Sequence, residues 1–204
     1  MPDKPLPSLL ERHWAESALA IGAIVIAAAS LWVAYDANVT NQELVAAASW
    51  PFMRTDYSNG FTTASGRPLL TVSALNSGIG PAKVESVEVF WHGKAYHDAA
   101  GLLRGCCGLT RRAAQQSQSR VLTASLQGTV VRPGQTVNLI WYPKPAQDEG
   151  PWERLNAIMT AGRVFPEVRI CYCSAFNQCW ISNGHTLDPP RVSACPVPKI
   201  SYDN

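Results

Sequence analysis

Three cysteines near the C-terminal end of the chain are the residues best suited to chemistry. Cys171, Cys173 and Cys179 lie on a segment whose β-rich runs and short central loop are typical of a β-hairpin. In an oxidising compartment such cysteines form structural disulfides, whereas in the cytosol they bind metals or act as redox thiols. The chemistry therefore depends on the compartment in which this segment lies.

The number and positions of the cysteines favour disulfides. All six follow an N-terminal apolar run, and an even number is typical of a disulfide framework. They are Cys106, Cys107, Cys171, Cys173, Cys179 and Cys195. We predict a bond between Cys173 and Cys179, because the hairpin loop brings them opposite each other. The partner of Cys171 stays open among Cys106, Cys107 and Cys195, and we expect Cys106 and Cys107 to bond to different partners rather than to each other.

Metal binding and catalysis are weaker interpretations of the same residues. A zinc site would use Cys171, Cys173, Cys179 and His185. Its spacing lacks the Cys-x-x-Cys of common zinc sites. A cysteine nucleophile with His92, His97 or His185 as its base stays an alternative, because catalytic groups assemble across long sequence distances. The chain has no phosphate-binding or dinucleotide-binding motif, so we predict no catalytic, cofactor-binding or metal-binding residue, no cofactor and no small-molecule substrate.

The elements that position the cysteines begin with an apolar run at Ser17–Tyr35. It has no charged residue, and its length covers a bilayer core of about 30 Å. Trp14 before it and Trp32 near its end lie where interfacial aromatic residues occur. The preceding residues lack the net positive charge of a signal peptide. We therefore predict a retained transmembrane helix; a signal peptide cleaved at the Ala-x-Ala of residues 27–29 and a buried globular helix are the alternatives.

The flanking charges predict an orientation. Lys4 and Arg12 precede the run, and no basic residue follows it until Arg54. By the positive-inside rule the N-terminus lies in the cytoplasm of a bacterium and residues 36–204 lie in the periplasm, anchored in the inner membrane. The predicted parts are a cytoplasmic segment (1–16), a transmembrane helix (17–35), a helical stalk (36–49) and a disulfide-bonded β-sandwich domain (50–204).

Short strands separated by turns dominate the chain after Trp50-Pro51, where proline ends the stalk. The predicted strands are Leu69–Asn76, Val84–Trp91, Lys94–His97, Arg120–Leu126, Thr136–Tyr142, Val168–Cys173 and Cys179–Ser182. Trp152–Gly162 has apolar residues at helical spacing. We predict a mainly β fold, an immunoglobulin-like sandwich of two sheets with one or two short inserted helices.

Two turn motifs carry a resemblance. Asn76-Ser-Gly-Ile-Gly-Pro-Ala82 and Arg132-Pro-Gly-Gln135, with the strands around them, resemble bacterial immunoglobulin-like adhesion and cell-surface modules. Together with the anchor, Trp50-Pro51 and the Cys171–Trp180 segment, they are similar to a group of proteobacterial membrane-anchored proteins with a cysteine-rich periplasmic domain. The resemblance implies a fold and a location, and it implies no activity.

The charge distribution bears on partners. The net charge is +2, and no acidic residue lies between Ala99 and Gln147. That window holds Arg104, Arg111, Arg112, Arg120, Arg132 and Lys144. These residues form either a solvated loop surface or a site for an acidic partner, and their dispersion argues against nucleic-acid binding.

The sequence therefore predicts a single-pass, membrane-anchored periplasmic module for interaction or structure, without catalytic activity and with a protein partner in the envelope. A thiol- or metal-dependent envelope enzyme that uses Cys171, Cys173 and Cys179 is one alternative. The other is an accessory subunit of a membrane complex, held through small residues of the helix such as Ala18 and Gly22.

Overall fold

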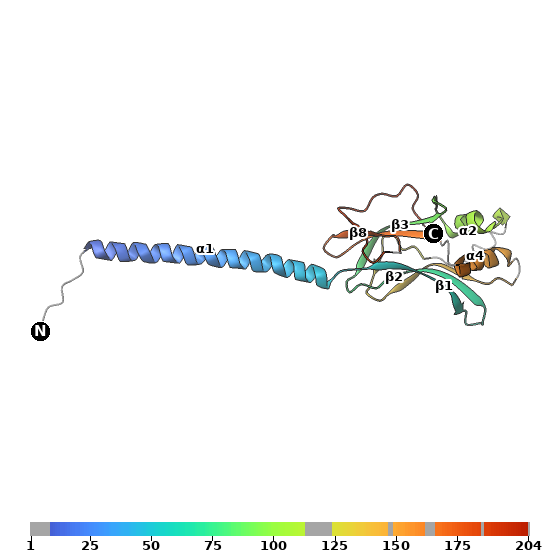
Figure 1. The fold of residues 1–204 in the computed structure, drawn as a ribbon, viewed down its shortest axis with the longest axis horizontal. Helices are drawn as coiled ribbons and strands as arrows, with labels where there is room; N and C mark the ends of the chain where they lie inside the picture. The colour runs from blue at the N-terminus through green and yellow to red at the C-terminus, as the bar shows by residue number, and fades with distance from the viewer. Residues whose placement is uncertain (1–8, 113–123, 147–148, 162–165, 185, 204) are drawn as a thin grey trace. The chain divides into compact units, whose positions relative to one another are not determined.

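The computed structural model describes residues 9–112, 124–146, 149–161, 166–184 and 186–203. The chain divides into two compact units, Met1–Ala47 and Ala48–Asn204. The described part of the first unit is one long helix, and all the strands that the structure describes belong to the second, which we call the β unit (Figure 1).

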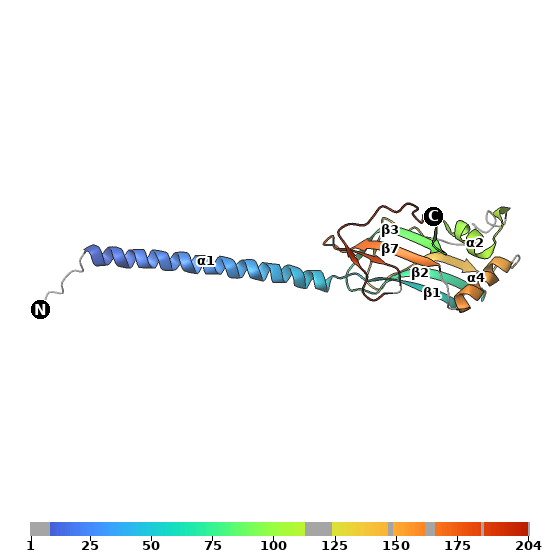
Figure 2. The ribbon, with the colours of Figure 1, turned by 45° about the horizontal axis from the view of Figure 1, so that its top comes forward.

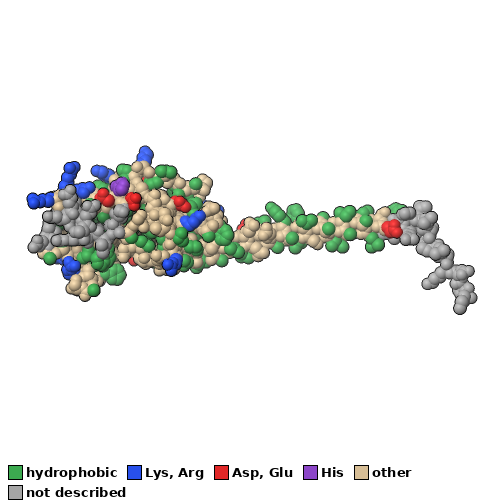
Figure 3. All heavy atoms as spheres, turned by 180° about the vertical axis from the view of Figure 1, so that it is seen from behind, with side chains coloured by type: hydrophobic (Ala, Val, Ile, Leu, Met, Phe, Trp, Pro, Cys, Tyr) green, Lys and Arg blue, Asp and Glu red, His purple; other side chains and the backbone are tan. Residues whose placement is uncertain are grey.

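Helix α1 runs without a break from Leu9 to Ala48, so the predicted span and stalk are one helix. Exposed apolar side chains lie along its length, and two of them, Ile24 and Trp32, expose 68% and 76% of their surface (Figure 3). Among the described residues it is the single helix long and apolar enough to cross a membrane. This surface is compatible with a membrane anchor or with a secretion signal.

The β unit contains two antiparallel sheets, which Figure 2 shows obliquely. The first has the order β1 (Met53–Thr62), β2 (Pro68–Asn76) and β6 (Thr136–Pro143). The second has the order β4 (Lys94–Tyr96), β3 (Ala82–Trp91), β7 (Glu167–Cys173), β8 (Cys179–Ser182) and β9 (Arg191–Val192). The short strand β5 (Val130–Val131) also pairs with β3.

Two short helices are inserted between the strands: α2 (Ala99–Cys107) and α4 (Gly150–Ala161). The Asp98 side chain caps the start of α2 by accepting a backbone N–H of its first turn. Gly108 ends the helix in the left-handed region, with φ 64°, which glycine adopts without steric cost. Arg154 of α4 donates from Nε to the carbonyl of Cys107. A cation therefore lies at the negative end of the α2 dipole and joins the two helices.

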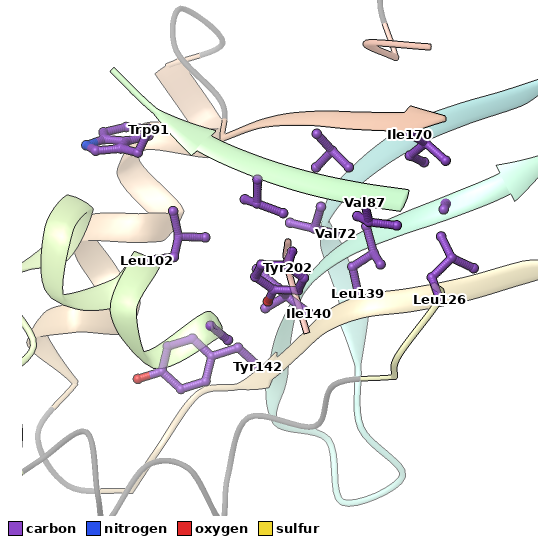
Figure 4. Close-up of a cluster of buried hydrophobic side chains, with 14 of the residues drawn as sticks. Val72, Val87, Trp91, Leu102, Leu126, Leu139, Ile140, Tyr142, Ile170 and Tyr202 are labelled. Atoms are coloured by element: carbon purple, nitrogen blue, oxygen red, sulfur yellow. The ribbon is translucent and has the colours of Figure 1, made fainter. Parts of the chain in front are cut away.

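One hydrophobic core joins both sheets and both short helices. Figure 4 shows Val72 and Ile140 of the first sheet near Val87 of the second, with Leu102 of α2 and Tyr202 of the C-terminal tail. All five side chains are at most 2% exposed. Burying a residue of this size stabilises the folded state by about 1.5–3 kcal/mol, so this shared core is what holds the elements together.

Asn76, at the end of β2, explains the turn-rich motif that follows it. Its fully buried side chain donates from Nδ2 to the carbonyls of Gly80 (2.8 Å) and Val131 (3.0 Å). Its Oδ1 accepts the backbone N–H of Phe52 (3.2 Å) and of Gly78 (3.1 Å). One amide with every hydrogen-bonding position used thus joins three segments that are distant in sequence.

The coarse prediction of an apolar N-terminal helix followed by two sheets is confirmed. Strands β2, β3, β4, β6, β7 and β8 and helix α4 lie within a residue or two of the predicted segments. The strand predicted at Arg120–Leu126 falls partly outside the described residues, and Leu126 itself is buried but not in a strand. Strands β1, β5 and β9 and helix α2 are additions that the sequence analysis missed.

Candidate functional site at the terminal hairpin

The hairpin of β7 and β8 is closed by a tight loop. The backbone N–H of Ser174 donates to the carbonyl of Gln178 (2.8 Å), and Ser174 Oγ accepts the N–H groups of Phe176 and Gln178. Asn177 takes the left-handed conformation, with φ 57°, which asparagine tolerates better than most residues. The loop therefore sets Cys173 directly opposite Cys179.

Two disulfides lie side by side at this hairpin. Cys173 is bonded to Cys179, as predicted, and Cys171 is bonded to Cys195, one of the three partners left open. Side chains alternate along a strand, so Cys171 and Cys173 share one face of β7 while Tyr172 points into the core from the other. The tail around Cys195 covers the cysteine face, which leaves Cys171 and Cys173 3% and 5% exposed.

The expectation that Cys106 and Cys107 bond to different partners is wrong, because the structure joins them to each other. Strand β3 gives the physical reason. Cys173 pairs with Lys83 at the start of β3, whereas α2 follows β4, which pairs with the end of β3 at Trp91. At about 3.3 Å for each residue of a strand, the adjacent cysteines at the end of α2 are too far from the hairpin to bond there.

The two hairpin disulfides touch each other. Sγ of Cys173 lies 3.9 Å from Sγ of Cys195, although each is bonded elsewhere. The sulfurs of Cys173, Cys179 and Cys195 all lie within 4.8 Å of one another. Cys173, Cys179 and Cys195 are also among the residues that line a cavity of about 440 Å³. The three clustered sulfurs therefore come from two different disulfides.

The cluster as it stands does not suit a metal. Metal-binding cysteines act as thiolates, and every cysteine of the chain is in a disulfide here. The fourth ligand of the zinc hypothesis, His185, lies outside the described residues. The sulfur geometry would suit a soft metal ion only after reduction.

Charged and apolar groups surround the cavity. Lys83 is the cross-strand partner of Cys173, and its Nζ donates to Oδ1 of Asn177 at 2.6 Å. Asn177 and Glu85 are lining residues of the cavity. On its rim Val197 is 94% exposed, and Phe176 of the adjoining hairpin loop is 51% exposed. The cavity thus has three cysteines in its lining and exposed apolar side chains in or beside it.

The tyrosine between the cysteines is strongly perturbed. Tyr172 is fully buried and stacks on Trp180 with 5.9 Å between ring centroids. Burial raises the pKa of its phenol to about 12. Burial likewise raises the pKa of Tyr57, whose hydroxyl donates to the carbonyl of Pro166. Both groups remain neutral at physiological pH and serve packing rather than proton transfer.

The histidines of the nucleophile hypothesis lie away from the cluster. His97 lines a separate surface hollow of about 520 Å³ with Tyr96, Asp98 and Arg104. His92 occupies a turn with φ 48° and packs edge-on against Trp91. Both belong to the β4 end of β3, and the hairpin cysteines lie at its other end. The structure therefore does not bring either histidine to the clustered sulfurs.

The basic residues between Ala99 and Gln147 do not all have the same surroundings in the structure. Lys144 forms ion pairs with Glu149 (2.7 Å) and Glu153 (3.4 Å), and the hydrogen bond with Glu149 raises its pKa. Arg104, Arg111, Arg112 and Arg132 are exposed, and Arg120 lies outside the described residues. The exposed arginines are those expected of a solvated surface.

The fold and the site define a disulfide-bonded β unit that follows a long apolar helix. Comparison of the chain with models of known families, with curated proteins and with solved structures gave no match. The function is therefore argued from the geometry above.

Proposed function

We propose that the chain is a single-pass, membrane-anchored module of the bacterial envelope whose β unit lies in the periplasm and binds a protein partner, rather than acting as an enzyme. The observation that carries this proposal is the pairing of an unburied apolar helix with a unit in which all six cysteines are disulfide-bonded. Disulfides persist in oxidising compartments. The basic residues near the helix lie on its N-terminal side, which favours the same orientation.

Paired reporter fusions after Asn204 test the orientation. Alkaline phosphatase, which needs its own disulfides, should be active, and a fluorescent protein that folds only in the cytoplasm should be dark. A matched variant in which Lys4 and Arg12 become serine while Asp36 and Asn41 become lysine reverses the charge bias, so it should lower phosphatase activity. A fluorescent fusion of the natural chain with inactive phosphatase would overturn the proposal.

The way in which the two sheets pack is part of the same proposal. We propose that the two sheets pack face to face as an immunoglobulin-like sandwich, and that the chain is related to the proteobacterial membrane-anchored proteins named in the sequence analysis. Support comes from the shared core, to which Val72 of the first sheet and Val87 of the second both contribute. Helices α2 and α4 would then be insertions into this sandwich. An experimental structure with unrelated sheet packing would contradict this proposal.

A thiol- or metal-dependent enzyme is the competing function, and the three clustered sulfurs of Cys173, Cys179 and Cys195 favour it. Alkylation of unfolded, unreduced protein counts the thiols, and elemental analysis of the same sample measures zinc. No labelled cysteine and no zinc would count against an enzyme of this kind. Several reactive thiols or one zinc per chain would count against the interaction module.

An accessory role in a membrane complex is the third proposal. Helix α1 carries Ala18 and Gly22 four residues apart, a spacing that permits close approach of another helix. Replacing residues 17–35 by an unrelated apolar helix should release the partners that co-purify through the membrane segment. Unchanged co-purification would assign the contacts to the β unit.

A further inference from the structure

We propose that the two hairpin disulfides form a thiol–disulfide exchange site. On reduction by an external dithiol, the bond between Cys171 and Cys195 is replaced by one between Cys173 and Cys195. This inference goes beyond the interaction module and does not depend on it, because it concerns chemistry that the purified chain can perform in either orientation.

The first argument is distance. Disulfide exchange requires a thiolate to reach a sulfur of an existing disulfide. Sγ of Cys173 is already in contact with Sγ of Cys195, at 3.9 Å. Once the bond from Cys173 to Cys179 opens, the Cys173 thiolate can reach Sγ of Cys195 without rearrangement of β7.

The second argument is the unequal freedom of the two sulfurs. Cys173 is held in β7 between paired strands, whereas Cys195 belongs to residues 193–201, which are in neither helix nor strand. The tail is next held at Ser201, whose hydroxyl donates to the side chain of Gln127, and at Tyr202, whose N–H donates to the carbonyl of Val87. A small displacement of the tail is therefore sufficient to bring Cys195 into bonding distance.

The third argument is access and charge. Cys173 and Cys179 are each 5% exposed, but both line the cavity of about 440 Å³ together with Cys195, and this cavity is the route by which a small dithiol would reach them. Residues directly opposite each other in an antiparallel pair have Cβ atoms about 4.5–5.5 Å apart, which sets the Lys83 side chain beside Cys173. A neighbouring ammonium stabilises a thiolate. Glu85, also on the cavity wall, opposes a thiolate, but it lies two residues along β3 from Lys83, at the irregularity between Val84 and Ser86, rather than opposite Cys173.

The electrons come from the external dithiol. One of its thiolates attacks Sγ of Cys179 to form a mixed disulfide, and Cys173 leaves as a thiolate. The donor's second thiol loses its proton to solvent and attacks the donor's own sulfur in that mixed disulfide. The donor departs as a cyclic disulfide, and Cys179 leaves as a thiolate that takes up a proton.

The exchange itself involves no net oxidation or reduction. The Cys173 thiolate attacks Sγ of Cys195, which forms the new bond and breaks the bond from Cys195 to Cys171. Cys171 leaves as a thiolate and takes up a proton. The donor has then lost two electrons, and the protein has one hairpin disulfide and two thiols, Cys171 and Cys179.

The variant Cys179→Ser isolates the exchange step, because it leaves Cys173 as a thiol beside the intact second disulfide. The full chain, extracted in detergent, is held at a pH of about 8.5, where roughly half of an ordinary cysteine is ionised, then labelled with iodoacetamide and mapped by mass spectrometry. We expect label on both Cys173 and Cys171, with about one tenth or more on Cys171. Label on Cys173 alone overturns the proposal.

The matched control is Cys106→Ser, which also leaves one odd thiol, at Cys107, but away from the hairpin. All its label should lie on Cys107, with both hairpin disulfides intact. Label on Cys171 or Cys173 in this control would mean that exchange occurs between any cysteines of the chain, and it too would overturn the assignment of a local site.

The natural chain provides a second measurement that needs no folded variant. Stepwise addition of dithiothreitol, followed by peptide mapping without further reduction, should reveal a peptide in which Cys173 is joined to Cys195, with label on Cys171 and Cys179. If this peptide is absent at every dithiothreitol concentration, the two disulfides are reduced independently and the proposal fails.

Discussion

Replacement of Asn76 by alanine tests how far the β unit depends on one buried amide. The change removes four hydrogen bonds and leaves the amides of Phe52 and Gly78 and the carbonyls of Gly80 and Val131 without this partner. A typical hydrogen bond contributes about 1 kcal/mol net, and a buried group left unpaired costs about 1–3 kcal/mol. We therefore expect the free energy of unfolding to fall by about 4 kcal/mol or more.

Thermal unfolding of the full chain in detergent, followed by near-ultraviolet circular dichroism with the disulfides intact, measures the effect. For a domain of this size 1 kcal/mol corresponds to about 2–4 °C, so the melting temperature should fall by roughly 8–16 °C.

Asn59→Ala is the matched control. Its side chain also donates two hydrogen bonds, to Asn156 and Thr160 of α4, but it is exposed. Loss of these bonds should cost less than about 1 kcal/mol, since water replaces them. If Asn76→Ala destabilises no more than this control, the buried amide does not hold the three segments together.

Three further predictions follow from contacts in the β unit. Stability should fall as pH rises from about 10 to 12, because the unfolded phenol of Tyr172 ionises near its ordinary pKa of about 10 while the folded one keeps its proton up to about 12. Tyr172→Phe should make this alkaline fall shallower, and an unchanged slope in denaturant titrations at each pH would contradict the assignment. Gly80→Ala should cost about 3 kcal/mol or more, since its Cβ would lie 1.7 Å from the carbonyl oxygen of Ser49, whereas Gly60→Ala meets nothing closer than 4.0 Å and should melt like the natural chain. Arg154→Met should lower the free energy of unfolding by about 1 kcal/mol through loss of the α2 cap; an unchanged melting temperature would mean that the cap is not needed.

Strands with a regular pattern were predictable from sequence, and strands without one were not. In Val84–Trp91, apolar residues recur at every second position from Val87 to Trp91, so the inward face of this part can be read directly. Strand β1 reads Met-Arg-Thr-Asp-Tyr-Ser-Asn-Gly-Phe-Thr, and its polar second half has no apolar face to reveal it. It is a strand because β2 beside it supplies hydrogen-bonding partners along its length.

Helix α2 was missed for a related reason. Two glycines and two cysteines in Ala99–Cys107 lower its helix propensity. Packing on α4 and the core overrides that propensity, and the local signals were confined to the ends, with Asp98 as the N-cap residue and Gly108 after the last turn.

Among the disulfides too, the pairing set by nearby residues was predictable, and the pairings set by the tertiary fold were not. The bond from Cys173 to Cys179 follows from loop length alone, so it was predictable. The bond between Cys106 and Cys107 depends on where α2 lies along β3, which no local pattern of residues specifies. The contact between Cys173 and Cys195 depends on the path of the tail, and only the density of cysteines indicated it.

The bond that joins the tail to β7 also affects how the chain would survive a protease. The segment enclosed by Cys171 and Cys195 contains Leu187, which is 87% exposed and therefore open to cleavage. A cut there leaves the C-terminal fragment covalently attached, with Tyr202 still in the core. Exchange to a bond between Cys173 and Cys195 would preserve this attachment, because Cys195 stays joined to β7 under either pairing.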